Sequence, residues 1–123
     1  MFNPFANKSY LSFANVAEAE SFSKRLKWGK GKTSILEGVT RSFKVIHSSE
    51  ELIQHYVEID VFSQGKHPTI KLPDGMSARN MGKNDIWIAA TTKSIEGAEL
   101  ITTDRDFEHL DDVFSKVNYI VPV

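Results

Sequence analysis

The chain contains no cysteine, which excludes disulfides and thiolate metal sites. It has little net charge, −1 at pH 7, so the molecule as a whole is not an evident polyanion binder. It also lacks a membrane-length apolar run and a signal peptide, and no glycine-rich phosphate loop supports a phosphate-binding domain. We therefore expect a cytoplasmic protein whose 123 residues form one domain, residues 1–123.

Two acidic clusters lie near the C-terminus, at Asn84–Ala90 and Leu100–Phe107. In the first, an acid opens an apolar helical run, and in the second, an acid follows an apolar strand-like run. An α/β protein with acids at these places can bring them together in one crevice. Carboxylates gathered in this way either repel one another or bind a hard divalent cation. Carboxylate-bound Mg²⁺ or Mn²⁺ is a common device for cleaving phosphodiesters.

Apolar periodicity and breaker residues predict an alternation of short strands and helices. Strands are expected at 10–13, 44–47, 98–102 and 119–121, and helices at 15–28, 33–43, 49–64, 84–96 and 106–114. The alternation in the second half predicts a parallel sheet covered by helices. The intervening loop, residues 66–82, is long for a compact domain, and such loops are often functional.

Several local signals set the expected ends of these elements. Gly29 and Gly31 are expected to end the first helix, and Gly65 the third. The segment 48–51, Ser-Ser-Glu-Glu, is an N-cap signal for the third helix with acids in its first turn. The second helix is expected to face inward through three apolar side chains, Ile35, Leu36 and Val39.

The acids near the C-terminus have structural as well as functional interpretations. Asp85 lies in the first turn of its helix, where a carboxylate stabilises the dipole by about 0.3–1 kcal/mol. The helix looks buried, however, and its start should face the crevice at the strand ends. Asp106 is expected to cap the following short helix. Asp104 has no such task, so it is the better functional candidate, oriented by Thr102 or Thr103.

Glu18 and Glu20 compete for a third acidic position. Glu18 lies beside the apolar stripe that contains Phe22, whereas Glu20 lies on the opposite side and can pair with Lys24. Glu18 is therefore expected to point toward the interior or a cleft. An acid beside an apolar stripe needs a partner, and both a metal ion and a salt bridge remain open.

The segment from Lys24 to Lys44 contains seven basic residues and one acid, Glu37. A basic surface separate from an acidic one suits an enzyme that steers RNA or DNA toward a metal site. From charge alone we prefer the simpler interpretation of solvated helix faces.

Two motifs, Asn84–Ala90 and Leu100–Phe107, with the upstream segment Ser12–Glu18, resemble PIN domains, most closely the toxin ribonucleases of VapBC toxin–antitoxin systems. The resemblance extends from about residue 9 to the end of the chain. It implies a three-layer α/β/α fold with a parallel sheet and acids that bind Mg²⁺ or Mn²⁺ and activate water to cut RNA. It also implies an antitoxin partner that lays a peptide across the metal crevice.

The resemblance implies a role for individual residues of this chain. The second, third and fourth acids of the family correspond to Glu18, Asp85 and Asp104, and Asp106 assists them as a metal ligand. Three residues, Arg79, Lys83 and Thr102, are the candidates for substrate binding.

The chain departs from the family at its N-terminus. PIN domains open with an apolar central strand that ends in the first metal-binding Asp, yet Met1–Ser9 has neither an apolar run nor an acid. Three explanations remain open: a start codon assigned too late, which we favour for the gene; a degraded remnant; and a compensating fold, such as strand exchange in a homodimer. The remnant would be a catalytically impaired module that binds an antitoxin or RNA.

Overall fold

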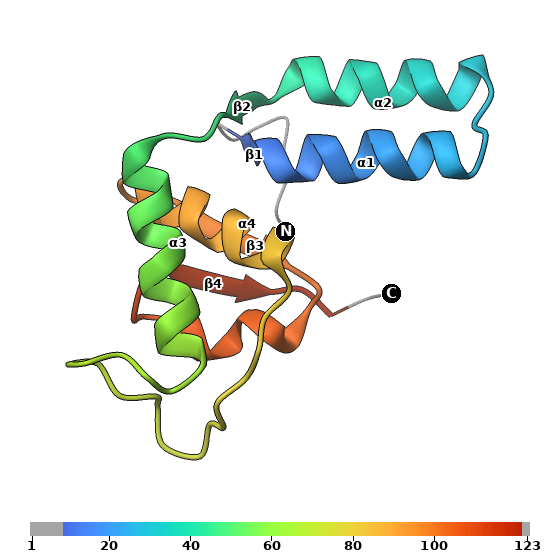
Figure 1. Ribbon diagram of the computed structural model, residues 1–123. Helices are drawn as coiled ribbons and strands as arrows, with labels where there is room; N and C mark the ends of the chain where they lie inside the picture. Colours follow the sequence, from blue (N-terminus) through green and yellow to red (C-terminus); the bar gives the residue numbers. More distant parts are fainter. Residues whose placement is uncertain (1–8, 122–123) are drawn as a thin grey trace. The chain divides into compact units, whose positions relative to one another are not determined.

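The computed structural model describes residues 9–121 (Figure 1). The chain divides into two compact units, and the boundary between them lies between Ser48 and Ser49. Each unit mixes helices with short parallel strands, which confirms the α/β class. Among the described residues, no helix is long and apolar enough to cross a membrane. The expected absence of a strand before Tyr10 concerns residues 1–8, which lie outside the described residues.

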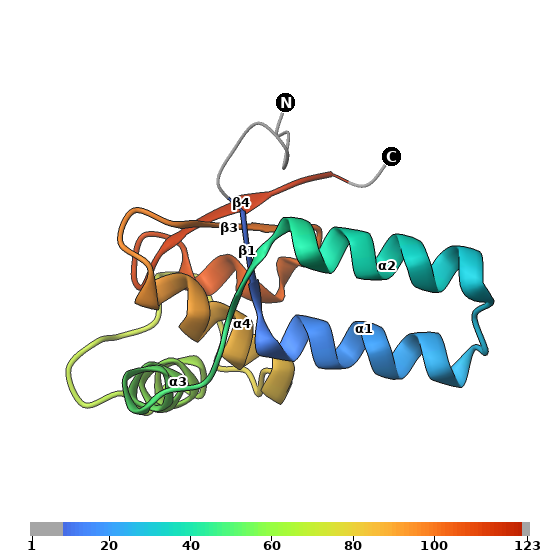
Figure 2. The same cartoon turned by 90° about the horizontal axis from the view of Figure 1, so that it is seen from above.

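The first unit is a helical hairpin flanked by two strands. It comprises β1 (Tyr10–Ser12), α1 (Phe13–Arg25), α2 (Lys30–Ser42) and β2 (Lys44–Ile46). The strands pair in parallel, and the two helices run side by side (Figure 2). The predicted strand at residues 10–13 ends at Ser12 because that residue caps α1. Its Oγ accepts the Ala14 N–H at 3.2 Å, and the Asn15 side chain accepts the Ser12 N–H at 3.0 Å.

The turn of the hairpin differs from the sequence prediction. The helix α1 ends at Arg25, and Lys27 has a positive φ of 54°. Gly29 is the N-cap of α2, and Gly31 lies inside that helix. The prediction that both glycines end the first helix is therefore wrong, because the chain already reverses at Lys27.

The apolar side chains of the hairpin are more exposed than their periodicity predicts. On α1, Phe22 is 46% and Leu26 56% exposed, and on α2, Ile35 is 69% and Val39 40% exposed. Leu36 is half-buried. The prediction that Ile35 and Val39 face inward is thus wrong, because α2 contains no buried residue.

The second unit contains a helix pair and a two-stranded parallel sheet. It comprises α3 (Glu50–Ser63), α4 (Lys83–Ser94), β3 (Glu99–Thr102), the 3₁₀-helix η1 (Arg105–Leu110) and β4 (Lys116–Tyr119). Helix α3 packs on α4, as Figure 1 shows. The segment between the two helices, which includes the predicted loop 66–82, has neither helix nor strand.

The ends of α3 follow the predicted signals. Ser49 is the N-cap, and its Oγ accepts the Leu52 N–H at 3.1 Å. After the helix, Gly65 has φ 73°, a conformation that favours glycine. Adjacent hydrogen-bonding groups determine both ends, so the sequence was sufficient to predict them.

The last two elements are shorter or earlier than expected. A helix was predicted at 106–114 and a strand at 119–121, whereas η1 ends at Leu110 and β4 begins at Lys116. Asp112 has φ 61°, which breaks the helix, and the Asp111 carboxylate accepts the Val117 N–H at 2.9 Å. The residues after Leu110 that were predicted to continue the helix therefore form a turn instead.

The core of the second unit lies among α3, α4, β3 and η1. Tyr56 and Trp87 join the two long helices through rings whose centroids are 4.4 Å apart. The predicted burial of α4 is confirmed for its apolar side chains Ile86, Ala89 and Ala90. The other buried apolar side chains of this unit are Leu52, Ile59, Phe62, Met81, Leu100, Phe107 and Leu110.

Candidate metal centre

Asp85 occupies the third position of α4 and is half-buried. Its carboxylate lies close to the N-cap Gly82, since a Cβ at that position would be 3.7 Å from Asp85 Oδ2. Gly82 has no side chain with which to cap the helix. The positive end of the helix dipole therefore acts on the Asp85 carboxylate and favours a negative charge at this place.

Asp104 stands in the turn between β3 and η1. Its backbone N–H donates to Thr102 Oγ1 at 3.0 Å, so the hydroxyl of Thr102 contacts the backbone of Asp104. Asp104 Oδ1 accepts the Asp106 N–H at 2.9 Å, so Asp104 is the N-cap of η1. The sequence-based assignment of this capping role to Asp106 is wrong, because η1 begins at Arg105.

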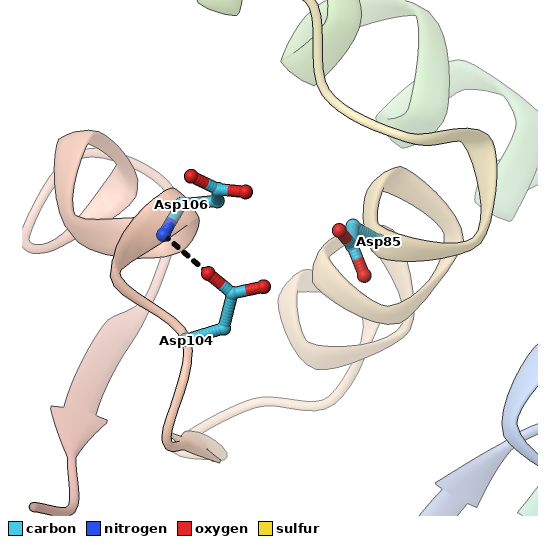
Figure 3. Close-up of side chains that lie close together, drawn as sticks. All are labelled: Asp85, Asp104 and Asp106. Atoms are coloured by element: carbon cyan, nitrogen blue, oxygen red, sulfur yellow. Dashed lines mark hydrogen bonds between the residues drawn. The ribbon is translucent and has the colours of Figure 1, made fainter.

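The three aspartates converge in the second unit. Asp85 comes from α4, whereas Asp104 and Asp106 come from the start of η1, and the side chains point toward one another (Figure 3). One carboxylate oxygen from each lies within 4.8 Å of the other two. Three negative charges at this separation repel one another unless a cation or a proton lies among them.

The donor set suits Mg²⁺ or Mn²⁺, since both ions favour carboxylate oxygens. Around an octahedral ion with bonds of about 2.1 Å, neighbouring ligand atoms lie about 3 Å apart and opposite ones about 4.2 Å apart. The observed limit of 4.8 Å is wider than both separations, so binding of an ion would draw the three carboxylates closer together. Asp104 and Asp106 are exposed, which leaves room for water ligands.

The substrate-binding candidates belong to the same unit as the three aspartates. Lys83 is the exposed first residue of α4, two positions before Asp85. Arg79 is half-buried, and its backbone N–H donates to the Ser63 carbonyl at 2.7 Å. The Thr102 hydroxyl accepts the Asp104 N–H, so its observed contact shapes the acidic turn.

Glu18 lies on α1 in the first unit and is exposed. The expected burial of Glu18 in the interior is therefore wrong for this unit, whereas the alternative that it faces a cleft stays a prediction. The cluster of three acids found among residues 9–121 lies entirely in the second unit. The role of Glu18 as a further metal ligand stays a prediction.

The sequence analysis did not predict a buried polar pair that joins the end of α3 to η1. Ser63 and His109 are both fully buried, and Ser63 Oγ lies 2.7 Å from His109 Nε2. The available signal was the position of His109 between two core residues, Phe107 and Leu110, three positions after Asp106. The four histidines of the chain share no ligand spacing, so the sequence predicts no chemical role for any of them.

No protein-family model matches this chain, and no curated protein and no solved structure is significantly similar to it. Its motifs and the geometry of its residues are therefore the basis for inferring its function.

Proposed function

We propose that this chain is a metal-dependent ribonuclease of the toxin type, with a PIN-like three-layer α/β/α arrangement and a Mg²⁺ or Mn²⁺ centre. The observation that carries the proposal is the convergence of Asp85, Asp104 and Asp106 from two separate segments. Two PIN-like motifs contain these acids in the order that the family has them. The short parallel strands are compatible with that arrangement.

Each residue has a distinct task in the proposed site. A bound Mg²⁺ or Mn²⁺ would make water more acidic and stabilise negative charge on a phosphodiester. The three aspartates would hold the ion, and Glu18 would be a further ligand. Lys83 and Arg79 would place positive charge against the RNA phosphates, and Arg79 can bind a phosphate in a bidentate manner.

The biological setting is part of the same proposal. The partner would be a cognate antitoxin that covers the acidic crevice, in the cytoplasm. In a homodimer, a strand of the second copy would pair with an open sheet edge and so compensate for the family's central strand. Among the described residues, each of the two parallel sheets has only two strands. Both sheets therefore have open edges that a further strand can join.

The test is an RNA cleavage assay with purified protein and a random-sequence RNA library. We expect cleavage in Mn²⁺ or Mg²⁺, complete loss in EDTA, and recovery when excess Mn²⁺ is restored. Sequencing of the cut ends reports the preferred site. Cleavage that continues unchanged in EDTA would rule out the metal-dependent mechanism.

A second candidate function is that of an RNA-binding module without turnover. It is favoured by the hairpin tip, which comprises Phe22, Arg25, Trp28 and Lys32 at the turn between α1 and α2. The Phe22 and Trp28 rings meet edge to face, with centroids 6.0 Å apart. Arg25 lies over Phe22 at 5.6 Å, and Lys32 over Trp28 at 5.7 Å. Aromatic rings interleaved with cations suit single-stranded RNA, because bases stack on the rings and phosphates bind the cations.

This second candidate predicts binding without metal. In fluorescence anisotropy with EDTA, Trp28→Ala should weaken the binding of a labelled single-stranded RNA about tenfold, since one base loses its stacking partner. Lys32→Glu should also weaken the binding of this RNA. Its control is Lys71→Glu, which makes the same change at an exposed lysine of the second unit. Equal affinities for the wild type, Trp28→Ala and Lys32→Glu would remove the hairpin tip as an RNA contact.

A further inference from the structure

Ser63, the last residue of α3, contacts two segments of the second unit at once. Its carbonyl accepts the Arg79 N–H at 2.7 Å, and its Oγ lies 3.2 Å from Met81 Sδ. Its Oγ also lies 2.7 Å from His109 Nε2. One serine thus ties the chain just before α4 to the 3₁₀-helix η1.

These two segments carry the two halves of the carboxylate cluster. Met81 lies four residues before Asp85 along the chain, and His109 three residues after Asp106. Because Asp104 caps η1, any movement of η1 moves both of its acids together. The distance between the halves therefore depends on how η1 is held against the segment that leads into α4.

The His109 ring is held on several sides. It is fully buried and stacks on Phe62, with an interplanar angle of 5°. Both contacts of Ser63 Oγ are hydrogen bonds at once only if Nε2–H donates to Oγ and the hydroxyl donates to Met81 Sδ. The other ring nitrogen, Nδ1, is buried with no hydrogen-bond partner among residues 9–121.

We infer that Ser63 and His109 are positioning residues, which set the separation between Asp85 and the Asp104–Asp106 pair and thereby the affinity of the metal centre. The inference rests on the proposed function, since it assumes that the three acids bind a cation. A buried polar pair is costly unless it is fully paired, so an orphaned partner forces the surrounding segments to shift. Groups hydrogen-bonded to metal ligands commonly change metal affinity about 10- to 100-fold. Ser63 and His109 act through the backbone segments that carry the ligands, so we expect an effect at the lower end of that range.

The experiment measures Mn²⁺ binding to the whole chain by calorimetry and by the electron paramagnetic resonance spectrum of the bound ion. Ser63→Ala removes only the hydroxyl, and Ser63→Cys keeps the shape with a weaker donor. We expect about tenfold weaker Mn²⁺ binding for Ser63→Ala, a smaller loss for Ser63→Cys and an altered spectrum for both. His109→Gln keeps a nitrogen that can reach Ser63, so it should retain more affinity than His109→Leu.

Thr91→Val is the matched control. The Thr91 hydroxyl is also buried in the second unit, but it donates to the Trp87 carbonyl of its own helix, at 2.8 Å. Its loss should lower the free energy of unfolding without changing the spectrum of bound Mn²⁺. A purely structural role of Ser63 would give that same result.

The outcomes separate the inference from the proposed function. A wild-type chain that binds no Mn²⁺ overturns both. A wild type that binds Mn²⁺ while Ser63→Ala and Ser63→Cys bind it equally well, with an unchanged spectrum, overturns the inference alone. Because Ser63→Cys preserves the packing, it gives an answer even if Ser63→Ala does not fold.

Discussion

Asp85→Asn is expected to lower Mn²⁺-dependent RNA cleavage by about a hundredfold or more, with most of the Mn²⁺ affinity lost as well. The amide has the shape of the carboxylate but no negative charge, so it is a poor ligand for a hard cation. The fold should survive, because the lost interaction with the helix dipole costs only about 0.3–1 kcal/mol. Initial rates, calorimetry and circular dichroism measure the three quantities.

Asp104→Asn distinguishes the metal role of Asp104 from its capping role. Asparagine caps helices about as well as aspartate does, so the η1 cap should persist. Cleavage should nevertheless fall as it does for Asp85→Asn. The matched control is Asp74→Asn, which makes the same change at an exposed acid of the loop between α3 and α4. If Asp85→Asn and Asp104→Asn cleave RNA as fast as the wild type and the Asp74→Asn control do, the cluster is not the active centre.

The free energy of unfolding is expected to decrease by up to about 3 kcal/mol as pH falls from 6.5 to 4, through His109 alone. The pKa of His109 is lowered from 6.5 to about 4, mainly by burial and also by the positive charge of Arg79, while the Asp106 backbone acts in the opposite direction. Between these pH values the unfolded chain binds a proton that the folded chain does not. Stability is therefore lost as pH falls, and the contribution of His109 to the slope disappears only above about pH 7.5, where the unfolded chain is also deprotonated.

Denaturant titrations at several pH values, with wild type and His109→Gln compared, isolate this contribution. Carboxylates also change stability in acid, so the difference between the two slopes is the quantity of interest. His47→Gln, at an exposed position of the first unit, is the control and should keep the wild-type slope. Identical slopes for the wild type and His109→Gln would show that His109 does not titrate as its burial requires.

Element types were predictable where local hydrogen bonds decide them. Ser49 caps α3 with its own hydroxyl, and Gly65 adopts a positive φ just after the helix. These signals act within a few residues, so a sequence displays them directly. Element ends were less predictable wherever turn residues intervene: Asp111 and Asp112 end η1 early and move β4 toward the N-terminus.

Burial was the property that local pattern predicted least well. The periodicity of α2 predicts an inward face, yet Ile35 and Val39 are exposed. The periodicity of α4 predicts burial, and Ile86, Ala89 and Ala90 are buried. The two helices differ because periodicity describes which side chains share a face, whereas burial depends on whether another element covers that face.

The sequence by itself determined that acids stand at the start of α4 and just after β3, because helix and strand signals are local. Only the tertiary structure decided that Asp85, Asp104 and Asp106 approach within 4.8 Å and that Asp104 is the cap. It also decided the pairing of Ser63 with His109, which lie 46 residues apart in the chain. The reason is physical: such contacts depend on how α3, α4 and η1 pack, and packing is a property of the whole unit.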